Sequence, residues 1–286
     1  MSRRTDNRHR VATICRAATG LPHHTCLHWA ETGLITRHRP VPDATAPAQR
    51  ALEAKVFLQL CADPLEGALL GITRVEPEPD GLHLWMDPGA ARQVVALLLP
   101  RFDMMFGGMG GIPGLRPVAD GGGLRLHSLL DGTSVVLRHP HPDWTSSFFA
   151  GAACDAHVWR HAPKGLDDSE REWLRTVPVR DARPDPDRDW LLSRLIRRSR
   201  LLSAGGSAHR CVGRFSAEGR ELAIEWCSAG AADLAVLLRR SGLAAGHGPA
   251  GSRGGRTLAL GAAAVTVRRS RCEAHAQRSA LECAAC

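Results

Sequence analysis

The side chains best suited to chemistry in this sequence are histidines and arginines placed to contact a polyanion. Imidazole and guanidinium groups donate hydrogen bonds to phosphate oxygens and to the edges of bases. The candidates lie in two places, the first forty residues and an arginine-rich segment after position 193. The residues that we expect to contact DNA are Arg3, Arg4, His23, His24, His28, Arg37, Arg39, Arg197 and Arg198.

The stretch Thr19–Ile35 predicts the turn, second helix and exit of a helix-turn-helix. Gly20 can adopt the left-handed conformation that ends a helix, and Pro22 suits the first turn of the next one. The apolar face of the preceding helix is Val11, Ile14, Cys15 and Ala18. The residues of the second helix expected to face inward are Leu21, Thr25, Cys26 and Trp29. With its histidines outward, this helix fits a major groove.

This spacing resembles the MerR-type winged helix-turn-helix. The residues that carry the resemblance are Gly20, Leu21, Thr25, Trp29, Gly33, Leu34 and Ile35. The resemblance implies a DNA-binding domain over residues 1–45, in which the segment Thr36–Pro40 would be the wing. A short helical hairpin without groove contact is the alternative interpretation of the same pattern.

After residue 45 the sequence predicts one order of elements twice, α-ββ-α-ββ. The first unit covers residues 46–142 and the second covers residues 189–270. The expected helices are Ala48–Cys61, one beginning at Asp87 and Pro88, Trp190–Leu202 and one capped by Ser228. The expected strands include Leu70–Val75, Leu82–Met86, Leu115–Val118, Leu124–Leu126, Val135–Arg138, Arg210–Phe215, Glu221–Trp226, Thr257–Leu260 and Ala264–Val267.

The predicted fold is therefore α+β, a helix-turn-helix followed by a tandemly duplicated α-ββ-α-ββ body. Residues 143–188 are expected to form a linker with one short helix, Asp168–Leu174, and residues 271–286 a C-terminal tail. In the helix Trp190–Leu202, leucines are expected to face inward and arginines to face solvent.

The second unit resembles the LAGLIDADG homing-endonuclease fold, in its non-catalytic form in WhiA-type sporulation regulators. The residues that carry the resemblance are Arg198, Leu201, Ala204–Ser207, Leu222–Glu225, Ala232, Leu237, Leu238, Gly242 and Leu243. The resemblance implies two packed motif helices and paired sheets that form a saddle on duplex DNA. The resemblance implies that cleavage would need an acid at the end of each motif helix, as in the active members of that family, to hold a divalent metal ion. Asp63 and Glu66 lie near the first helix end, but Gly206 and Ser207 occupy that place in the second. No enzyme activity is expected.

Two alternatives to a helix-turn-helix regulator stay open. The body could make the main DNA contact as a degenerate homing-endonuclease-type protein. The chain could also sense a small molecule in a pocket between the repeats, lined by Trp85 and Trp226.

The net charge and the cysteines limit which partners and which cellular compartment the protein can have. The 286 residues carry a net charge of +8, with eight basic and three acidic side chains in residues 1–50 but seven against eleven in residues 51–150. The ends therefore attract phosphate more than the middle does. Nine scattered cysteines, no signal peptide and no apolar stretch long enough for a membrane helix favour a cytoplasmic protein.

The expected partners are double-stranded DNA and a second copy of the chain, with no membrane and no cofactor. Zinc at Cys272, His275, Cys283 and Cys286, which have metal-ligand spacing, is left open.

Overall fold

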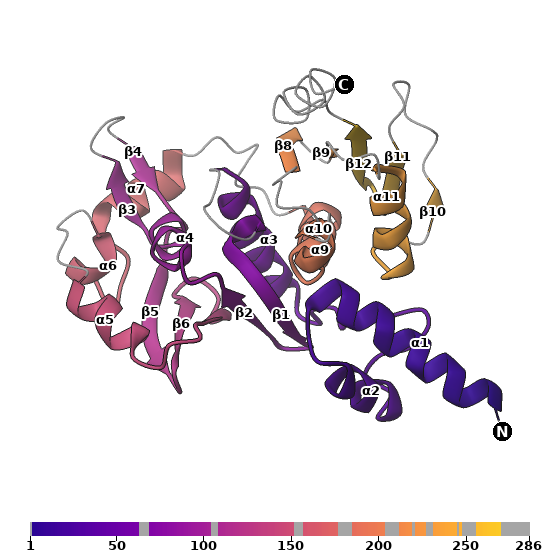
Figure 1. The fold of residues 1–286 in the computed structure, drawn as a ribbon. Coiled ribbons are helices and arrows are strands. Elements are labelled where there is room, and N and C mark those ends of the chain that lie inside the picture. The colour runs from indigo at the N-terminus through magenta and orange to yellow at the C-terminus, as the bar shows by residue number, and fades with distance from the viewer. Residues whose placement is uncertain are drawn as a thin grey trace, which may run out of the picture.

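The chain has an α+β fold with a helical N-terminal region (Figure 1). The computed structural model describes residues 2–62, 69–103, 108–151, 157–176, 185–203, 212–218, 221–226, 231–244, 246–247 and 256–269. In this part of the chain, no helix is long and apolar enough to cross a membrane.

The N-terminal region consists of α1 (Ser2–Thr19) and α2 (His23–Glu31). Gly20 between them has φ +78°, the left-handed conformation predicted for it, and Gly33 after α2 has φ +79°. The two helices share a small core made of Val11, Ala12, Cys15, Leu21, Cys26 and Ile35. The predicted inward face of α2 is therefore confirmed at Cys26, and Trp29 packs partly buried against this core.

The helix pair is docked on the rest of the molecule through its turn. A side chain at Gly20 would bring a Cβ atom to 3.2 Å from the carbonyl oxygen of Thr73 and 3.5 Å from Cα of Arg74. Ala18 belongs to the main hydrophobic core and not to the small one. The orientation of α1 and α2 is therefore fixed against the body rather than left to a linker.

The first sheet has the strand order β1-β2-β7-β6-β5. It follows α3 (Pro47–Ala62) and the 3-10 turn η1 (Leu69–Gly71). The sheet strands are β1 (Ile72–Glu78), β2 (Gly81–Met86), β5 (Leu115–Asp120), β6 (Gly123–Ser128) and β7 (Ser134–Arg138), and α4 (Ala91–Leu98) follows β2. Neighbouring strands are antiparallel except β2 and β7, which pair in parallel. A separate short hairpin joins β3 (Arg101–Asp103) to β4 (Gly108–Gly110).

The second sheet has the order β8-β9-β12-β11-β10. Its strands are β8 (Val212–Glu218), β9 (Glu221–Trp226), β10 (Gly246–His247), β11 (Arg256–Leu260) and β12 (Ala263–Arg269). The helices of this half are α9 (Pro186–Ile196), α10 (Ser199–Ser203) and α11 (Ala231–Arg240). Here too the second hairpin strand pairs in parallel with the last strand, so that Trp226 lies opposite Arg269 as Trp85 lies opposite Arg138.

Helices α3 and α9 lie side by side between the two sheets (Figure 1). Leucines from α3, α9 and both sheets belong to one continuous hydrophobic core, with Leu52, Leu84, Leu192 and Leu222 each nearly or fully buried. The two sheets are therefore not independent of each other, because burial of the α3–α9 interface joins them.

Three predictions about local structure are wrong. Helix α4 begins at Ala91 and not at Asp87, because Asp87 Oδ1 accepts a hydrogen bond from the Gly89 N–H (3.0 Å) in a turn before the helix. The helix expected over Trp190–Leu202 ends at Ile196 and resumes as α10. The segment expected to be a linker with one short helix also contains helices before that one. Its described helices are α5 (Trp144–Gly151), α6 (Val158–His161) and α7 (Asp168–Thr176).

Candidate nucleic-acid interface

The outer face of α2 is polar and open to solvent. His24 and His28, one helical turn apart, are both exposed, whereas Cys26 between them is fully buried. His23 is half-buried and lies against His9 of α1. The predicted outward placement is therefore confirmed for His24 and His28, whose imidazoles can meet a partner from solution, whereas His23 is partly covered by His9.

The expected wing is a tight turn. Thr36 and Arg39 exchange two backbone hydrogen bonds, N–H of Thr36 to O of Arg39 (2.9 Å) and N–H of Arg39 to O of Thr36 (3.1 Å). No strand occurs in residues 2–62, so the β-hairpin of a winged helix is missing from the N-terminal region. Arg37 and Arg39 are nonetheless exposed as predicted.

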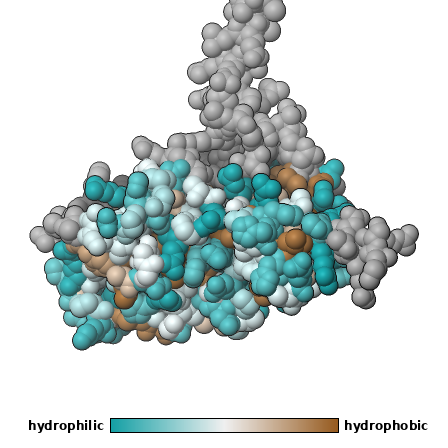
Figure 2. All heavy atoms as spheres, turned by 60° about the horizontal axis from the view of Figure 1, so that its bottom comes forward, coloured by the Kyte–Doolittle hydropathy of each residue, from teal (hydrophilic) through white to brown (hydrophobic). Residues whose placement is uncertain are grey.

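Positive charge dominates the surface of the N-terminal region. The exposed arginines between residues 7 and 45 are Arg8, Arg10, Arg16, Arg37 and Arg39. Glu31 is the exposed carboxylate in the same range. Figure 2 looks onto the side that carries α1 and α2, where polar residues predominate and apolar residues form small scattered patches. This surface would attract a polyanion.

The first residues of the chain are helical from Ser2, as part of α1. Arg3 and Arg4 lie in that helix, but their side chains lie outside the described residues.

Arg197 is not a surface residue, contrary to the prediction. Its side chain is fully buried, and its guanidinium makes a two-pronged ion pair with Glu53 of α3, with Nε to Oε2 at 2.8 Å and Nη2 to Oε1 at 2.7 Å. Its remaining N–H groups donate to the carbonyl oxygens of Pro42 (3.0 Å), Glu78 (2.8 Å) and Gly81 (3.0 Å). All five donors of the guanidinium are used, so none is left for a phosphate.

Both carboxylate oxygens of Glu53 accept hydrogen bonds from other residues besides Arg197. Oε1 also accepts a hydrogen bond from Gln49 Nε2 (2.9 Å), and Oε2 accepts one from the hydroxyl of Ser193 (2.6 Å). A carboxylate buried between α3 and α9 with four donors around it has no vacant position for a metal ion.

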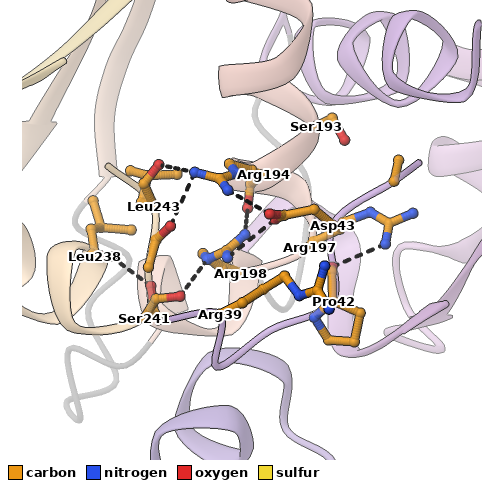
Figure 3. Close-up of polar contacts among 12 residues, drawn as sticks. Arg39, Pro42, Asp43, Ser193, Arg194, Arg197, Arg198, Leu238, Ser241 and Leu243 are labelled. Atoms are coloured by element: carbon orange, nitrogen blue, oxygen red, sulfur yellow. Dashed lines mark hydrogen bonds and ion pairs between the residues drawn. The ribbon is translucent and has the colours of Figure 1, made fainter. Parts of the chain in front are cut away.

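Arg198 is also buried, and the prediction of a solvent-facing side chain is wrong for it too. It donates to the carbonyl oxygens of Ser241 (3.0 Å) and Arg194 (2.9 Å) and lies 3.4 Å from Asp43 Oδ1 (Figure 3). Burial lowers the pKa of Arg198 to about 10, which leaves it charged at neutral pH.

Arg194 pairs with the other oxygen of Asp43 at 2.5 Å and donates to the carbonyl oxygens of Gly242 and Leu243. Asp43 thus ties the exit of the N-terminal region to Arg194 and Arg198, and these two arginines in turn hold the residues that follow α11.

The physical reason for this error lies in the break between α9 and α10. An uninterrupted helix would carry Arg194, Arg197 and Arg198 along one stripe, but Arg197 and Arg198 lie in the turn after Ile196. The acids that receive them, Glu53 and Asp43, are 144 and 155 positions away in the sequence. No local pattern could have revealed that partnership.

A second buried ion pair, which was also not predicted from the sequence, joins β5 to α7. Arg116 Nη2 lies 2.6 Å from Glu170 Oε2, and the two side chains are 2% and 0% exposed. Arg116 also donates to the carbonyl oxygens of Ala162 (2.7 Å), Gly165 (2.6 Å) and Leu115 (3.0 Å). Although desolvation by burial opposes it, hydrogen bonds from Arg116 and two backbone N–H groups lower the pKa of Glu170.

The thiols of Cys15 and Cys26 meet in the small core between α1 and α2. The hydrogen bond that Cys15 shares with Cys26, together with burial, raises the pKa of Cys15 far above its ordinary value. The same hydrogen bond lowers the pKa of Cys26. Both residues are fully buried, so they serve as packing residues of the helix pair.

Arginines and aromatic rings also occur on the outer face of the first sheet. The Arg74 guanidinium lies 3.7 Å from the centre of the Trp85 ring, and Arg125 pairs with Asp120 at 2.7 Å. The strand register places Arg74, Trp85 and Arg138 in one row across the sheet. Arg74 already covers one face of Trp85, so that face offers no empty cage to a cationic ligand.

Several residues singled out by their type and spacing lie outside the described residues. They are Asp63, Glu66, Ala204–Ser207, Cys272, His275, Cys283 and Cys286. In the described ranges, no three His, Cys, Asp or Glu side chains come together in a group that could hold a metal ion.

No family model, curated protein or solved structure matches the chain.

Proposed function

We propose that this protein binds double-stranded DNA sequence-specifically through α2 and acts in the cytoplasm as a transcriptional regulator without catalytic activity. The observation that carries the proposal is the division of α2 into a packed inner face and a solvent-exposed outer face with His24 and His28. Imidazoles on such a face reach base edges in a major groove, and Arg37 and Arg39 beside the helix exit supply phosphate contacts. A second copy of the chain would place another α2 about 34 Å away on a palindromic site.

The docking of the helix pair supports the same function. Gly20 lies against β1, and Asp43 is held by Arg194 and Arg198. A reading helix fixed on a large body loses little freedom when it enters a groove, so less binding free energy is lost to ordering.

The alternative is that the body contacts DNA, and one observation favours it. The two sheets have the same strand order and the same parallel pairing, as a duplicated saddle of the LAGLIDADG kind would require. Arg74 and Arg138 of the first sheet would then supply phosphate contacts to the duplex. A cleaving enzyme is not proposed in either case, because Gly206 and Ser207 stand in the sequence where the second motif helix would need its acid.

The test begins with selection of preferred duplexes from a random pool by the full-length protein. We expect enrichment of a defined site, and we expect His24→Ala and His28→Ala each to weaken binding to it by about 1–3 kcal/mol, or roughly 5- to 150-fold. Binding to an unrelated duplex should change little, because base contacts carry the discrimination. Fluorescence anisotropy on both duplexes measures the two affinities.

His141→Ala is the matched control, since His141 is also exposed but lies before α5, far along the chain from α2. It should leave both affinities at the parent level. If no duplex is enriched, or if His24→Ala and His28→Ala retain the parent's preference, α2 is not the reading helix.

A further inference from the structure

Two imidazoles from different helices face each other at the entrance of α2. Nδ1 of His9 on α1 lies 3.5 Å from Nε2 of His23, the first residue of α2. The ring planes are inclined by only 21° and the ring centres are 5.7 Å apart. Since the centres are much further apart than the nitrogens, the two nitrogens lie in the gap between the rings. His9 is exposed and His23 is half-buried, so the gap is open to solvent.

The spacing of these nitrogens suits a shared metal ion better than it suits a hydrogen bond. Hydrogen bonds donated by N–H groups in proteins usually span about 2.7–3.2 Å, so the separation of 3.5 Å is long for a hydrogen bond. Two nitrogens bound at about 2.0–2.1 Å to one zinc ion in roughly tetrahedral geometry are about 3.3–3.4 Å apart. The centre-to-centre distance of 5.7 Å shows that the two nitrogens point at each other, so both imidazoles turn when their lone pairs meet on a common ion.

We propose that His9 and His23 form a two-histidine site for a divalent transition-metal ion, of which Zn²⁺ is the natural probe. Imidazole nitrogen is a preferred ligand of zinc, copper and nickel, while Mg²⁺ and Ca²⁺ prefer oxygen. Two protein ligands leave open positions that water or an anionic oxygen fills. The ion joins α1 to α2 and thereby stabilises the helix pair in its folded arrangement.

The surroundings make this an exchangeable site. Imidazole brings no negative charge to the ion, the N-terminus of α2 carries the positive end of the helix dipole, and Arg8 and Arg10 flank His9 in the sequence. Each of these factors lowers the affinity for a cation relative to a structural zinc site with thiolate ligands. The helix pair therefore folds without the ion and responds to its concentration.

The test titrates Zn²⁺ into the metal-free full-length protein by calorimetry, without DNA, so its outcome is independent of the proposed function. Other residues, including Cys272 and His275, also offer ligands, so the informative quantity is the difference in stoichiometry between variants. We expect His9→Gln and His23→Gln each to lose one zinc equivalent relative to the parent, and His38→Gln, in the exposed turn, to lose none. Circular dichroism checks that all variants keep the helical content of the parent.

Two further readouts identify the atoms. NMR of the imidazole nitrogens should show Zn²⁺ shifting Nδ1 of His9 and Nε2 of His23, and His9→Cys should restore the lost equivalent through a thiolate. The proposal is overturned if the parent binds no zinc, if His9→Gln and His23→Gln keep the parent's stoichiometry, or if zinc shifts only His24 and His28.

Discussion

Replacing Arg197 by alanine is expected to lower the free energy of unfolding by about 3–5 kcal/mol, because it leaves the carboxylate of Glu53 buried without its counter-ion. Both side chains are 0% exposed, so water cannot replace the lost partner. Three carbonyl oxygens, of Pro42, Glu78 and Gly81, lose a donor at the same time. Urea denaturation of the full-length protein, followed by circular dichroism, measures the change.

Arg200→Ala is the matched control, since Arg200 belongs to the same arginine-rich segment but is exposed. It should change the unfolding free energy by less than about 0.5 kcal/mol. The double variant Glu53→Leu with Arg197→Met should recover part of the lost stability, because an apolar pair removes the buried charge altogether. If Arg197→Ala were as mild as Arg200→Ala, the buried ion pair between α3 and α9 would be wrong.

The second large effect is expected at Arg116. Arg116→Ala should also lower the unfolding free energy by about 3–5 kcal/mol, since Glu170 would keep a buried charge without the guanidinium. Arg125→Ala, on the next strand, is the control, because its pair with Asp120 is 44% and 29% exposed and contributes about 0–1 kcal/mol.

Acid should weaken the same pair in the parent. The pKa of Glu170 is lower in the folded chain than its ordinary value of 4.5. Its contribution to stability is therefore complete above about pH 4.5 and is lost as pH falls through the lower folded pKa. The Glu170→Gln variant should lack this part of the pH dependence. An identical acid profile for parent and Glu170→Gln would contradict the charge assigned to Glu170.

Helices and strands were predictable from the sequence where the residues that determine them are close together along the chain. A strand was predicted over Leu82–Met86, where β2 lies, and Gly20 predicted the end of α1 because few other residues tolerate a positive φ. The exposed face of α2 followed from helical periodicity alone. These features depend on residues a few positions apart.

Prediction from the sequence failed where distant groups decide the outcome. Arg197 and Arg198 resemble a solvated basic patch until Glu53 and Asp43 are brought to them by the fold. The pairing of His9 with His23 depends on how α1 crosses α2, and the sequence contains no signal for that angle. The expected wing was wrong because Thr36–Arg39 closes as a turn with too few residues for two strands.

The salt dependence of binding to the selected duplex shows most directly whether the N-terminal region holds the DNA. Each arginine that neutralises a phosphate contributes about 0.9 to the slope of log affinity against log salt. The variant Arg37→Gln with Arg39→Gln should therefore flatten the slope by about 2. Arg74→Gln with Arg125→Gln, on the outer face of the first sheet, should leave the slope at the parent value. A flatter slope only in the sheet variant would contradict binding through α2 and assign the DNA contact to the body.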